Sequence, residues 1–369
     1  MKILILVSSL TAGGEQRVAS LWTKGFTEYG HDVIMVLGCS RKQPRTYEVP
    51  SQTKIYHVNN FIAHHLYKRL GIDFFYTKRL RRIIKQSQPD IIISLYHPWT
   101  EWADEVTKGT GIPIISTEHI SFERPTSAKK MSSNNIHRRY ELNKNYAAMT
   151  VLTTADKECL KGYIDNVNVL PNPLAYTPAN VIPPKTNIIL AVGQLHSWQC
   201  KGLDLLIKAW GKEAINFPEW KLQIAGGDRN NSQSYLQSIA DSFQLGKQIE
   251  FLGFQRNMLP IYQRASVFVL SSRYEGFGMA LTEAMSQGCA CIACDYKGRQ
   301  KEIMPQDNQG ILCPIDDIEA LADAIHKMLS DKEFRKTIQL NGIERSKHYQ
   351  LGNIMEYWKE IFNKINITL

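Results

Sequence analysis

The feature that most constrains the fold is an alternation of short apolar runs with longer amphipathic segments. Runs of strand length include Lys2–Ser8, Val33–Leu37 and Ile91–Leu95, and helix-length segments such as Gln16–Glu28 stand between them. Strands that alternate with helices are typical of βαβ units and parallel sheets. The sequence therefore predicts an α/β protein with doubly wound, Rossmann-like sheets.

A proline-rich break divides this alternation into two parts. Pro171, Pro173, Pro183 and Pro184 lie in a stretch without periodicity, and the alternation resumes with an apolar run at Ile188–Val192. The chain has 369 residues, and single cores stop growing at roughly 250–300 residues. We predict one domain over residues 1–178, a second over residues 179–350, and an amphipathic helix over residues 351–369.

Composition excludes several classes of protein. Hydrophobic residues make up 43% and charged residues 21% of the chain, which is ordinary globular usage and excludes disordered and fibrous proteins. The apolar stretch Ile3–Val7 is too short to span a bilayer and has no cleavage site after it, so we expect a cytoplasmic protein. Seven scattered cysteines indicate reduced thiols. Three of them, Cys289, Cys291 and Cys294, lie in an apolar run typical of a buried strand, so we expect no metal site there.

The positive charge is concentrated in the first half of the chain. Residues 1–180 contain 23 Lys and Arg against 15 Asp and Glu, whereas residues 181–369 contain 21 against 20. A basic segment from Lys68 to Arg82 is interleaved with the aromatic residues Phe74, Phe75 and Tyr76. This pattern is typical of a helix on an anionic membrane surface, and a solvated basic helix face explains it equally well.

Two loops of the first half follow predicted strands and carry candidate ligands. Gly13 and Gly14 precede the first helix, where backbone amides can approach a phosphate or a sugar, although a plain tight turn explains the glycines as well. Glu118 and His119 follow the strand predicted at Ile112–Ser116. Because ligands of such sheets bind at the carboxyl ends of strands, His119 is a candidate to contact a sugar hydroxyl or to move a proton.

A third loop, in the second half, carries two glutamates. Glu275 and Glu283 flank Gly276-Phe277-Gly278, and the next helix is predicted to begin near Gly278. Free amides at the positive end of a helix suit a diphosphate, and carboxylates accept hydrogen bonds from hydroxyl groups. A nucleotide-sugar along this element would place its sugar at Glu275 and its ribose at Glu283.

Together these residues resemble the retaining GT-B glycosyltransferases of family GT4, over essentially the whole chain. The Glu-x7-Glu motif of that family is intact from Glu275 to Glu283. The other matching segments are Gly13-Gly14-Glu15 with Arg17, Glu118-His119, Ala225-Gly-Gly-Asp228, Phe251-Leu-Gly253, Gly298 to Glu302, and Gly310-Ile-Leu. The resemblance implies the GT-B fold, with two Rossmann-like domains facing a central cleft and a C-terminal helix that returns to the first domain.

The resemblance also assigns roles by position in these motifs. It implies that Lys201, in Cys200-Lys201-Gly202, is the cation beside the diphosphate, and that Glu275 contacts the transferred sugar. The expected catalytic residues are His119, Glu275 and Lys201. The expected donor-binding residues are Gly14, Gln194, Lys201, Phe254, Arg273, Glu275, Gly276, Phe277, Gly278, Met279, Ala280, Leu281 and Glu283.

One position departs from the family pattern. The family has Gly-Arg-Leu ahead of the lysine, with the arginine on the diphosphate, whereas this chain has Gly193-Gln194-Leu195. A glutamine can donate hydrogen bonds but carries no charge. Arg273 and Arg299 are candidates to supply the missing charge.

We therefore expect a retaining glycosyltransferase, either a hexosyltransferase or an N-acetylhexosaminyltransferase. Its expected donor is a nucleotide-sugar, with a UDP-sugar as the first candidate, and we expect neither a cofactor nor a metal. The expected acceptor is a saccharide on a lipid at the inner face of the cytoplasmic membrane, in bacterial surface polysaccharide or lipopolysaccharide synthesis, without nucleic acid. Two other classes fit part of the sequence. A sugar-nucleotide epimerase of the same fold would act without an acceptor, and a non-catalytic basic protein would bind membranes or nucleic acid. Carboxylates at Glu275 and Glu283 disfavour nucleic acid, because clustered anions repel it.

Overall fold

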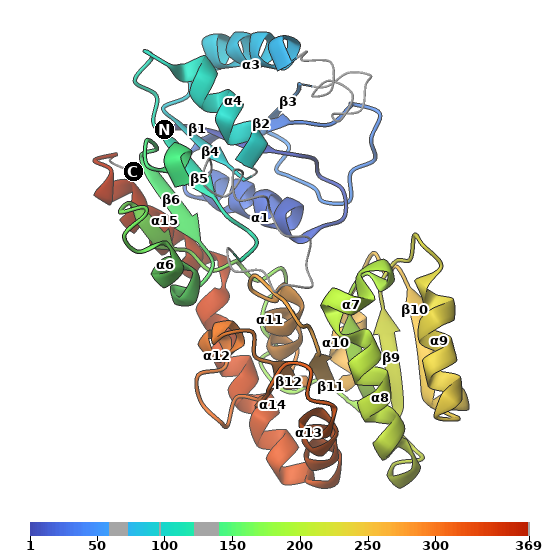
Figure 1. The fold of residues 1–369 in the computed structure, drawn as a ribbon. Coiled ribbons are helices and arrows are strands. Elements are labelled where there is room, and N and C mark those ends of the chain that lie inside the picture. The colour runs from blue at the N-terminus through green and yellow to red at the C-terminus, as the bar shows by residue number, and fades with distance from the viewer. Residues whose placement is uncertain (59–72, 96, 122–139, 368–369) are drawn as a thin grey trace. The chain divides into compact units, whose positions relative to one another are not determined.

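The computed structural model describes residues 1–58, 73–95, 97–121 and 140–367 (Figure 1). The described chain forms two compact units. Unit 1 contains the described residues up to Pro173 together with those from Leu351 onward, and unit 2 contains Leu174–Gln350. The stretch between Val169 and Thr186, where the prolines cluster, contains neither helix nor strand.

Unit 1 is built on a parallel seven-stranded sheet in the order β3-β2-β1-β4-β5-β6-β7. Its strands are β1 (Lys2–Val7), β2 (Asp32–Leu37), β3 (Lys54–His57), β4 (Ile91–Ser94), β5 (Ile114–Thr117), β6 (Ala148–Val151) and β7 (Val167–Val169). β1 lies in the middle, paired in parallel with β2 and β4. Its buried run Ile3–Val7 explains this place, because a central strand of a covered parallel sheet is apolar on both faces.

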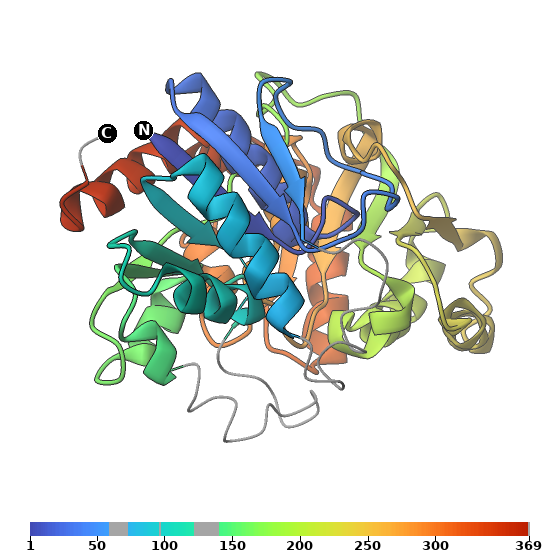
Figure 2. The same cartoon turned by 90° about the horizontal axis from the view of Figure 1, so that it is seen from above.

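Helices cover the sheet of unit 1. They are α1 (Gly14–Glu28), α3 (Asp73–Ser87), α4 (His97–Thr107), α6 (Thr154–Leu160) and α15 (Leu351–Lys364). α3 and α4 share a core with alternate residues of the central strands. α15 lies beside α1 (Figures 1 and 2), and Trp358 meets Trp22 edge to face with ring centroids 5.0 Å apart. The last helix of the chain is therefore part of the first unit.

Unit 2 is built on a parallel six-stranded sheet in the order β10-β9-β8-β11-β12-β13. Its strands are β8 (Thr186–Val192), β9 (Lys221–Ala225), β10 (Ile249–Gly253), β11 (Ala265–Leu270), β12 (Ala290–Cys294) and β13 (Ile311–Cys313). Every pairing among these strands is parallel. The carboxyl ends of the strands therefore lie along one edge, where ligands of such sheets bind.

The helices of unit 2 are α7 (Trp198–Lys201), α8 (Leu203–Glu213), α9 (Ser232–Ser242), α10 (Leu259–Arg264), α11 (Met279–Ser286), α12 (Arg299–Ile303), α13 (Ile318–Ser330) and α14 (Lys332–Ser346). Short 3-10 turns lie at Leu195–Ser197, Ala214–Asn216, Gly246–Gln248 and Lys347–Tyr349. α8, α9 and α13 share one core with the sheet. The acids predicted at the start of α13 act as its cap: the Asp317 carboxylate accepts from the Ala320 amide at 2.9 Å.

The predicted fold class, two Rossmann-like parallel sheets, is confirmed. Several short elements, among them β3, β6, β7 and β13, were not predicted, because runs of three or four residues carry little periodicity. Part of the predicted basic helix, residues 67–72, lies outside the described residues. Among the described residues, no helix has both the length and the apolar character needed to cross a bilayer.

Candidate active site

The carboxyl edge of the unit 2 sheet brings together the loops that follow three strands. Gln194 follows β8, Phe254 follows β10, and the loop from Ser271 to Gly278 follows β11. Gln194 and Phe254 are exposed, with 57% of Phe254 accessible, so both are available to a ligand. The topology thus gathers the residues predicted for the donor from widely separated parts of the chain.

The two residues predicted as catalytic in unit 2 contact one another. The Lys201 ammonium donates to Oε1 of Glu275 at 2.5 Å, and the Ser272 hydroxyl donates to the same oxygen at 2.9 Å. Burial alone would lower the pKa of Lys201, but the charge of Glu275 and the hydrogen bond to it raise that pKa above its usual value. Lys201 therefore stays protonated, as a cation beside a diphosphate must.

Glu283 lies one helical turn inside α11 and is buried, with 4% of its surface accessible. Its Oε2 accepts a hydrogen bond from the Tyr262 hydroxyl at 2.9 Å. A solvated acid on a helix surface would show neither feature, so Glu283 is not such an acid. Tyr262 itself carried no signal in the sequence, because it belongs to α10 and meets Glu283 only through the fold.

Gly278 sets the start of α11. It precedes the helix with a φ of 96°, a left-handed conformation that favours glycine, and an added Cβ would lie 3.1 Å from Leu270 Cδ2. The Leu281 amide already donates to the Gly278 carbonyl at 2.9 Å. The amides of the turn ahead of it, from Gly276 to Ala280, lie at the positive end of the helix. The Phe277 side chain points away into the core, edge to face with Tyr349 at 5.4 Å.

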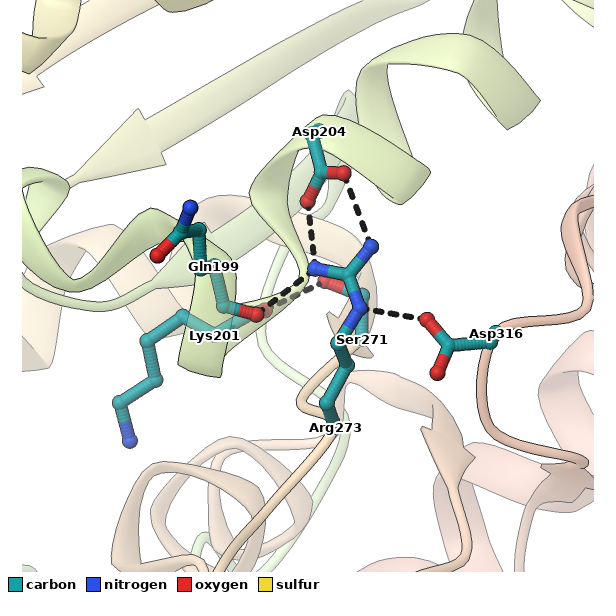
Figure 3. A network of polar contacts seen from close by, with 6 residues as sticks. All are labelled: Gln199, Lys201, Asp204, Ser271, Arg273 and Asp316. Atoms are coloured by element: carbon teal, nitrogen blue, oxygen red, sulfur yellow. Dashed lines mark hydrogen bonds and ion pairs between the residues drawn. The ribbon is translucent and has the colours of Figure 1, made fainter. Parts of the chain in front are cut away.

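The two arginines considered as substitutes for charge at Gln194 have other partners. Nη1 and Nη2 of Arg273 donate to the two carboxylate oxygens of Asp204, each at 2.8 Å, and Nε donates to Asp316 (Figure 3). The hydrogen bonds from Arg273 to Asp204 hold the pKa of Arg273 above its usual value. Arg299 is completely buried and lies over the ring of Tyr296. Asp204 could have been suspected as an acid in the first turn of a helix.

In unit 1, Gly14 and His119 lie at the carboxyl edge of the sheet, after β1 and β5. Gly14 opens α1 and is exposed, and the preceding Gly13 has extended backbone, so no left-handed turn is needed there. The His119 ring packs 5.5 Å from that of Trp22, and its Nε2 lies 3.1 Å from the Thr117 hydroxyl. Burial lowers the pKa of His119 to about 4, against an opposing effect of Asn172. At neutral pH His119 is a neutral hydrogen-bonding group and not a cation.

A carboxyl group with an unusual pKa lies on the same edge. Burial and then the charge of Glu118 raise the pKa of Glu15 to about 7, although hydrogen bonds from Ser8 oppose this. The Oε1 atom of Glu15 is buried without a hydrogen-bond partner among the described residues. In the sequence, Glu15 belongs to the glycine turn, and no local pattern predicts that its side chain is buried.

The three closely spaced cysteines of unit 2 are core residues. Cys289, Cys291 and Cys294 are buried, the last two within β12, and burial raises the pKa of each thiol. Across the described residues, no group of three His, Cys, Asp or Glu side chains is placed to hold a metal ion.

Comparison with known families identifies the class of protein. Residues 12–175 match the family described as Glycosyltransferase Family 4, and residues 175–345 match the family described as Glycosyl transferases group 1. The chain belongs to the GT4-type glycosyltransferases of the GT-B fold, and it is a transferase enzyme.

Relatives and solved structures extend over nearly the whole chain. An uncharacterized glycosyltransferase of Haemophilus influenzae is 26% identical over 95% of this chain and 96% of its own. A Campylobacter jejuni enzyme named as a GalNAc-alpha-(1->4)-GalNAc-alpha-(1->3)-diNAcBac-PP-undecaprenol alpha-1,4-N-acetyl-D-galactosaminyltransferase is 24% identical over 99% of both chains. A Staphylococcus aureus TarM variant in complex with Fondaparinux, alpha-GlcNAc-glycerol and UDP has a TM-score of 0.82 at 14% identity, covering 98% of this chain and 99% of its own.

Proposed function

We propose that this glycosyltransferase moves a sugar with retention from a UDP-sugar to a saccharide acceptor carried on a lipid, in the synthesis of a bacterial surface polysaccharide. The observation that carries the proposal is the Lys201–Glu275 ion pair beside the start of α11, with Glu283 buried behind it. The Campylobacter relative is named for an acceptor on PP-undecaprenol, and the TarM structure contains UDP. These names support the acceptor and donor classes.

The geometry suits charge stabilisation at a leaving diphosphate. The transition state resembles an oxocarbenium ion, and negative charge builds on the departing diphosphate. Lys201 and the first amides of α11 would stabilise that charge, and the ion pair holds both side chains in place before the donor arrives. On binding, the sugar hydroxyls would share the Glu275 carboxylate with Lys201. In this mechanism the donor phosphate assists the incoming hydroxyl, and neither a metal nor a cofactor takes part.

Association with an anionic membrane surface is the second part of the proposal. Arg81 and Arg82 on α3 are exposed, and so is 62% of Phe75. Burial and the nearby charges of Arg41 and Arg82 lower the pKa of Arg79, as expected where cations crowd together. Tyr76 does not belong to this surface, because it is buried in a stack with Trp102.

Release of nucleoside diphosphate tests the enzymatic proposal. In a panel of UDP-, GDP- and ADP-sugars, we expect a UDP-sugar to release its nucleoside diphosphate, and we expect this release to depend on an added saccharide or lipid-linked acceptor. Conversion of the donor to an epimer without acceptor would instead favour a sugar-nucleotide epimerase. Salt-sensitive binding to nucleic acid without any turnover would favour the non-catalytic alternative. Glu319→Gln, a change of an exposed acid on α13, is the matched control for Glu275→Gln in each assay.

A further inference from the structure

The end of helix α7 is held from outside. α7 is a single turn of four residues and has little stability of its own. Its last three carbonyl oxygens all accept hydrogen bonds from the loop after β11. The pairs are Gln199 O with Arg273 Nη1 at 2.7 Å, Cys200 O with the Arg273 amide at 2.9 Å, and Lys201 O with the Ser271 hydroxyl at 2.9 Å (Figure 3). The loop that carries Glu275 therefore fixes the backbone position of Lys201.

The residue after Lys201 shows how closely the two segments approach. Gly202 has a φ of 58°, and an added Cβ would lie 1.9 Å from the carbonyl oxygen of Ser271. No other residue type fits this left-handed position against a backbone atom. The α7 turn and the β11–α11 loop thus pack directly against each other; together they are called the α7–loop assembly.

Arg273 is at the centre of the α7–loop assembly. Its guanidinium makes four hydrogen bonds, to the Gln199 carbonyl, to both oxygens of Asp204, and to Asp316 (Figure 3). The Lys201 ammonium points away from it in the same view and reaches Glu275. Arg273 thus organises the segment around Lys201, and the side chain of Lys201, not that of Arg273, extends to Glu275.

The arrangement depends on the planar fork of an arginine. Two parallel N–H groups match the two oxygens of Asp204, and the third side of the guanidinium reaches Asp316. Asp204 is only 9% accessible, so loss of its partner would leave a carboxylate buried without compensation. A lysine at this position could not replace all four hydrogen bonds.

We propose that Arg273 is a positioning residue that acts through Lys201. It holds the α7 turn against the β11–α11 loop so that the ammonium meets the diphosphate of the donor. This inference rests on the proposed function, because it takes a nucleoside diphosphate as the ligand of Lys201. Since Gln194 supplies no charge, the placement of this lysine decides how strongly the diphosphate is bound.

The role predicts a selective loss of affinity. Lys201 would contact the diphosphate, so a displaced Lys201 should weaken the binding of UDP and leave the binding of UMP almost unaffected. Isothermal titration with the full-length chain measures both affinities and also the fraction of molecules that bind. We expect Arg273→Gln to weaken UDP binding about tenfold and UMP binding less than about twofold. Arg273→Lys should restore little of the UDP affinity.

A double-mutant cycle separates positioning from direct contact. In a Lys201→Met background, Arg273→Gln should have no further effect on UDP affinity, because the residue it positions is gone. Additive losses would mean that Arg273 contacts the diphosphate itself and would overturn the proposal. Equal losses of affinity for UDP and UMP would also overturn the proposal, since they would indicate general damage to the α7–loop assembly.

Two further variants keep the test decisive. Arg335→Gln is the matched control, because that guanidinium also donates to two backbone carbonyls of unit 2, those of Met328 and Leu329. It should leave both affinities unchanged. If Arg273→Gln does not fold, Ser271→Ala removes the hydrogen bond to Lys201 O without exposing a buried charge, and we expect a loss of about threefold for UDP alone. An unchanged UDP affinity in folded Ser271→Ala would count against the proposal.

The outcomes also distinguish this inference from the function beneath it. If the wild-type chain binds none of UDP, GDP and ADP, the proposed function fails. If it binds one of them and Arg273→Gln leaves that affinity intact, the function stands and only the positioning role fails. The nucleotide bound most tightly by the wild type, with its monophosphate, then serves as the probe pair.

Discussion

The carboxyl edges of the two sheets differ in how their charged groups are satisfied. In unit 2, Lys201 pairs with Glu275, Tyr262 donates to Glu283, and Arg273 lies between two carboxylates. In unit 1, buried atoms of Glu15 and His119 have no hydrogen-bond partner among the described residues, and both groups have strongly shifted pKa values. The charged side chains at the edge of unit 2 are thus already paired before any ligand binds. At the edge of unit 1, burial changes the protonation of Glu15 and His119.

The two units also differ in how acidic and basic residues are balanced. Residues 38–89 contain 11 Lys and Arg against 2 Asp and Glu, a net charge equal to the +9 of the entire chain. This segment of unit 1 has few acids with which its cations could pair. The charged groups of the candidate site in unit 2 are paired with one another, whereas residues 38–89 of unit 1 carry a net positive charge that attracts anions.

The largest expected effect concerns the segments that make up unit 1. Deleting residues from Asn353 onward should give insoluble or inactive protein, because it removes Trp358 and Phe362 and exposes the rings of Trp22 and Phe26 on α1. Solubility after expression and near-ultraviolet circular dichroism would measure this. A soluble, fully active truncation would show that unit 1 does not need its last helix.

The next effect should come from the ion pair of unit 2. Glu275→Gln should lower kcat about a hundredfold, close to 3 kcal/mol, because contacts to the sugar hydroxyls strengthen as the ring flattens. Its nucleotide affinity should change little, because Arg273 and Ser271 still hold the backbone of α7, and with it Lys201, in place. Steady-state rates with the donor selected from the panel would test this, with Glu319→Gln as the control. Abolished binding of free nucleotide in Glu275→Gln would reverse the placement of the donor along this loop.

Local sequence patterns could predict some parts of the candidate site but not others. Glu275 lies in the loop after β11, and Lys201 and Glu283 lie in the first α-helices after β8 and β11. Parallel topology alone places such segments on one edge. The partners Tyr262, Asp204 and Asp316 come from other elements, and no periodicity connects them to the site. Local sequence patterns predict candidate groups, but tertiary packing decides how these groups pair and how their pKa values shift.

Charge in unit 1 should govern binding to anionic vesicles. Changing Arg79, Arg81 and Arg82 to Gln should weaken sedimentation with anionic vesicles by about 2 to 3 kcal/mol at low salt, since each surface cation contributes about 1 kcal/mol. The difference should shrink as salt screens the charges. Lys247, Lys332 and Lys336, exposed cations of unit 2, give a control with the same change of charge. Equal binding of both triple variants at low salt would remove α3 from the membrane surface.

The pH dependence of stability should reveal the two groups of unit 1 with strongly shifted pKa values, Glu15 and His119. Glu15 keeps its proton in the folded state up to pH about 7, and its ordinary value is 4.5, so this group makes the unfolding free energy fall as pH rises between these values. His119, lowered from 6.5 to about 4, has the opposite effect and makes stability fall as pH decreases through that window. The two contributions oppose one another in the wild type.

Single variants should separate these contributions. Between pH 4.5 and 7, the stability of Glu15→Gln relative to wild type should rise by about 2 kcal/mol, and that of His119→Gln should fall relative to wild type from acid to neutral pH. Urea unfolding at several pH values measures both slopes. Glu28→Gln, an exposed acid at the other end of α1, should follow the wild type. Parallel curves for all variants would show that neither group titrates abnormally.

The smallest effect should come from the buried glutamate of unit 2. The ribose is unchanged by the reaction, so a contact to it contributes equally to ground and transition states. Glu283→Gln should therefore raise the donor KM about tenfold, near 1.4 kcal/mol, with kcat almost unchanged. Tyr262→Phe should raise KM less, about threefold, because the carboxylate remains and loses only the hydrogen bond that orients it.

This last pair of variants also tests whether unit 2 is arranged in advance. If Tyr262 orients Glu283, then Tyr262→Phe in the Glu283→Gln background should add much less than its threefold effect in the wild type. Calorimetry with free UDP should give the same ratios as KM, because ribose contacts are made without the sugar. A fall in kcat with unchanged KM for Glu283→Gln would mean that this carboxylate faces the reacting sugar and that the donor lies along α11 in the opposite direction.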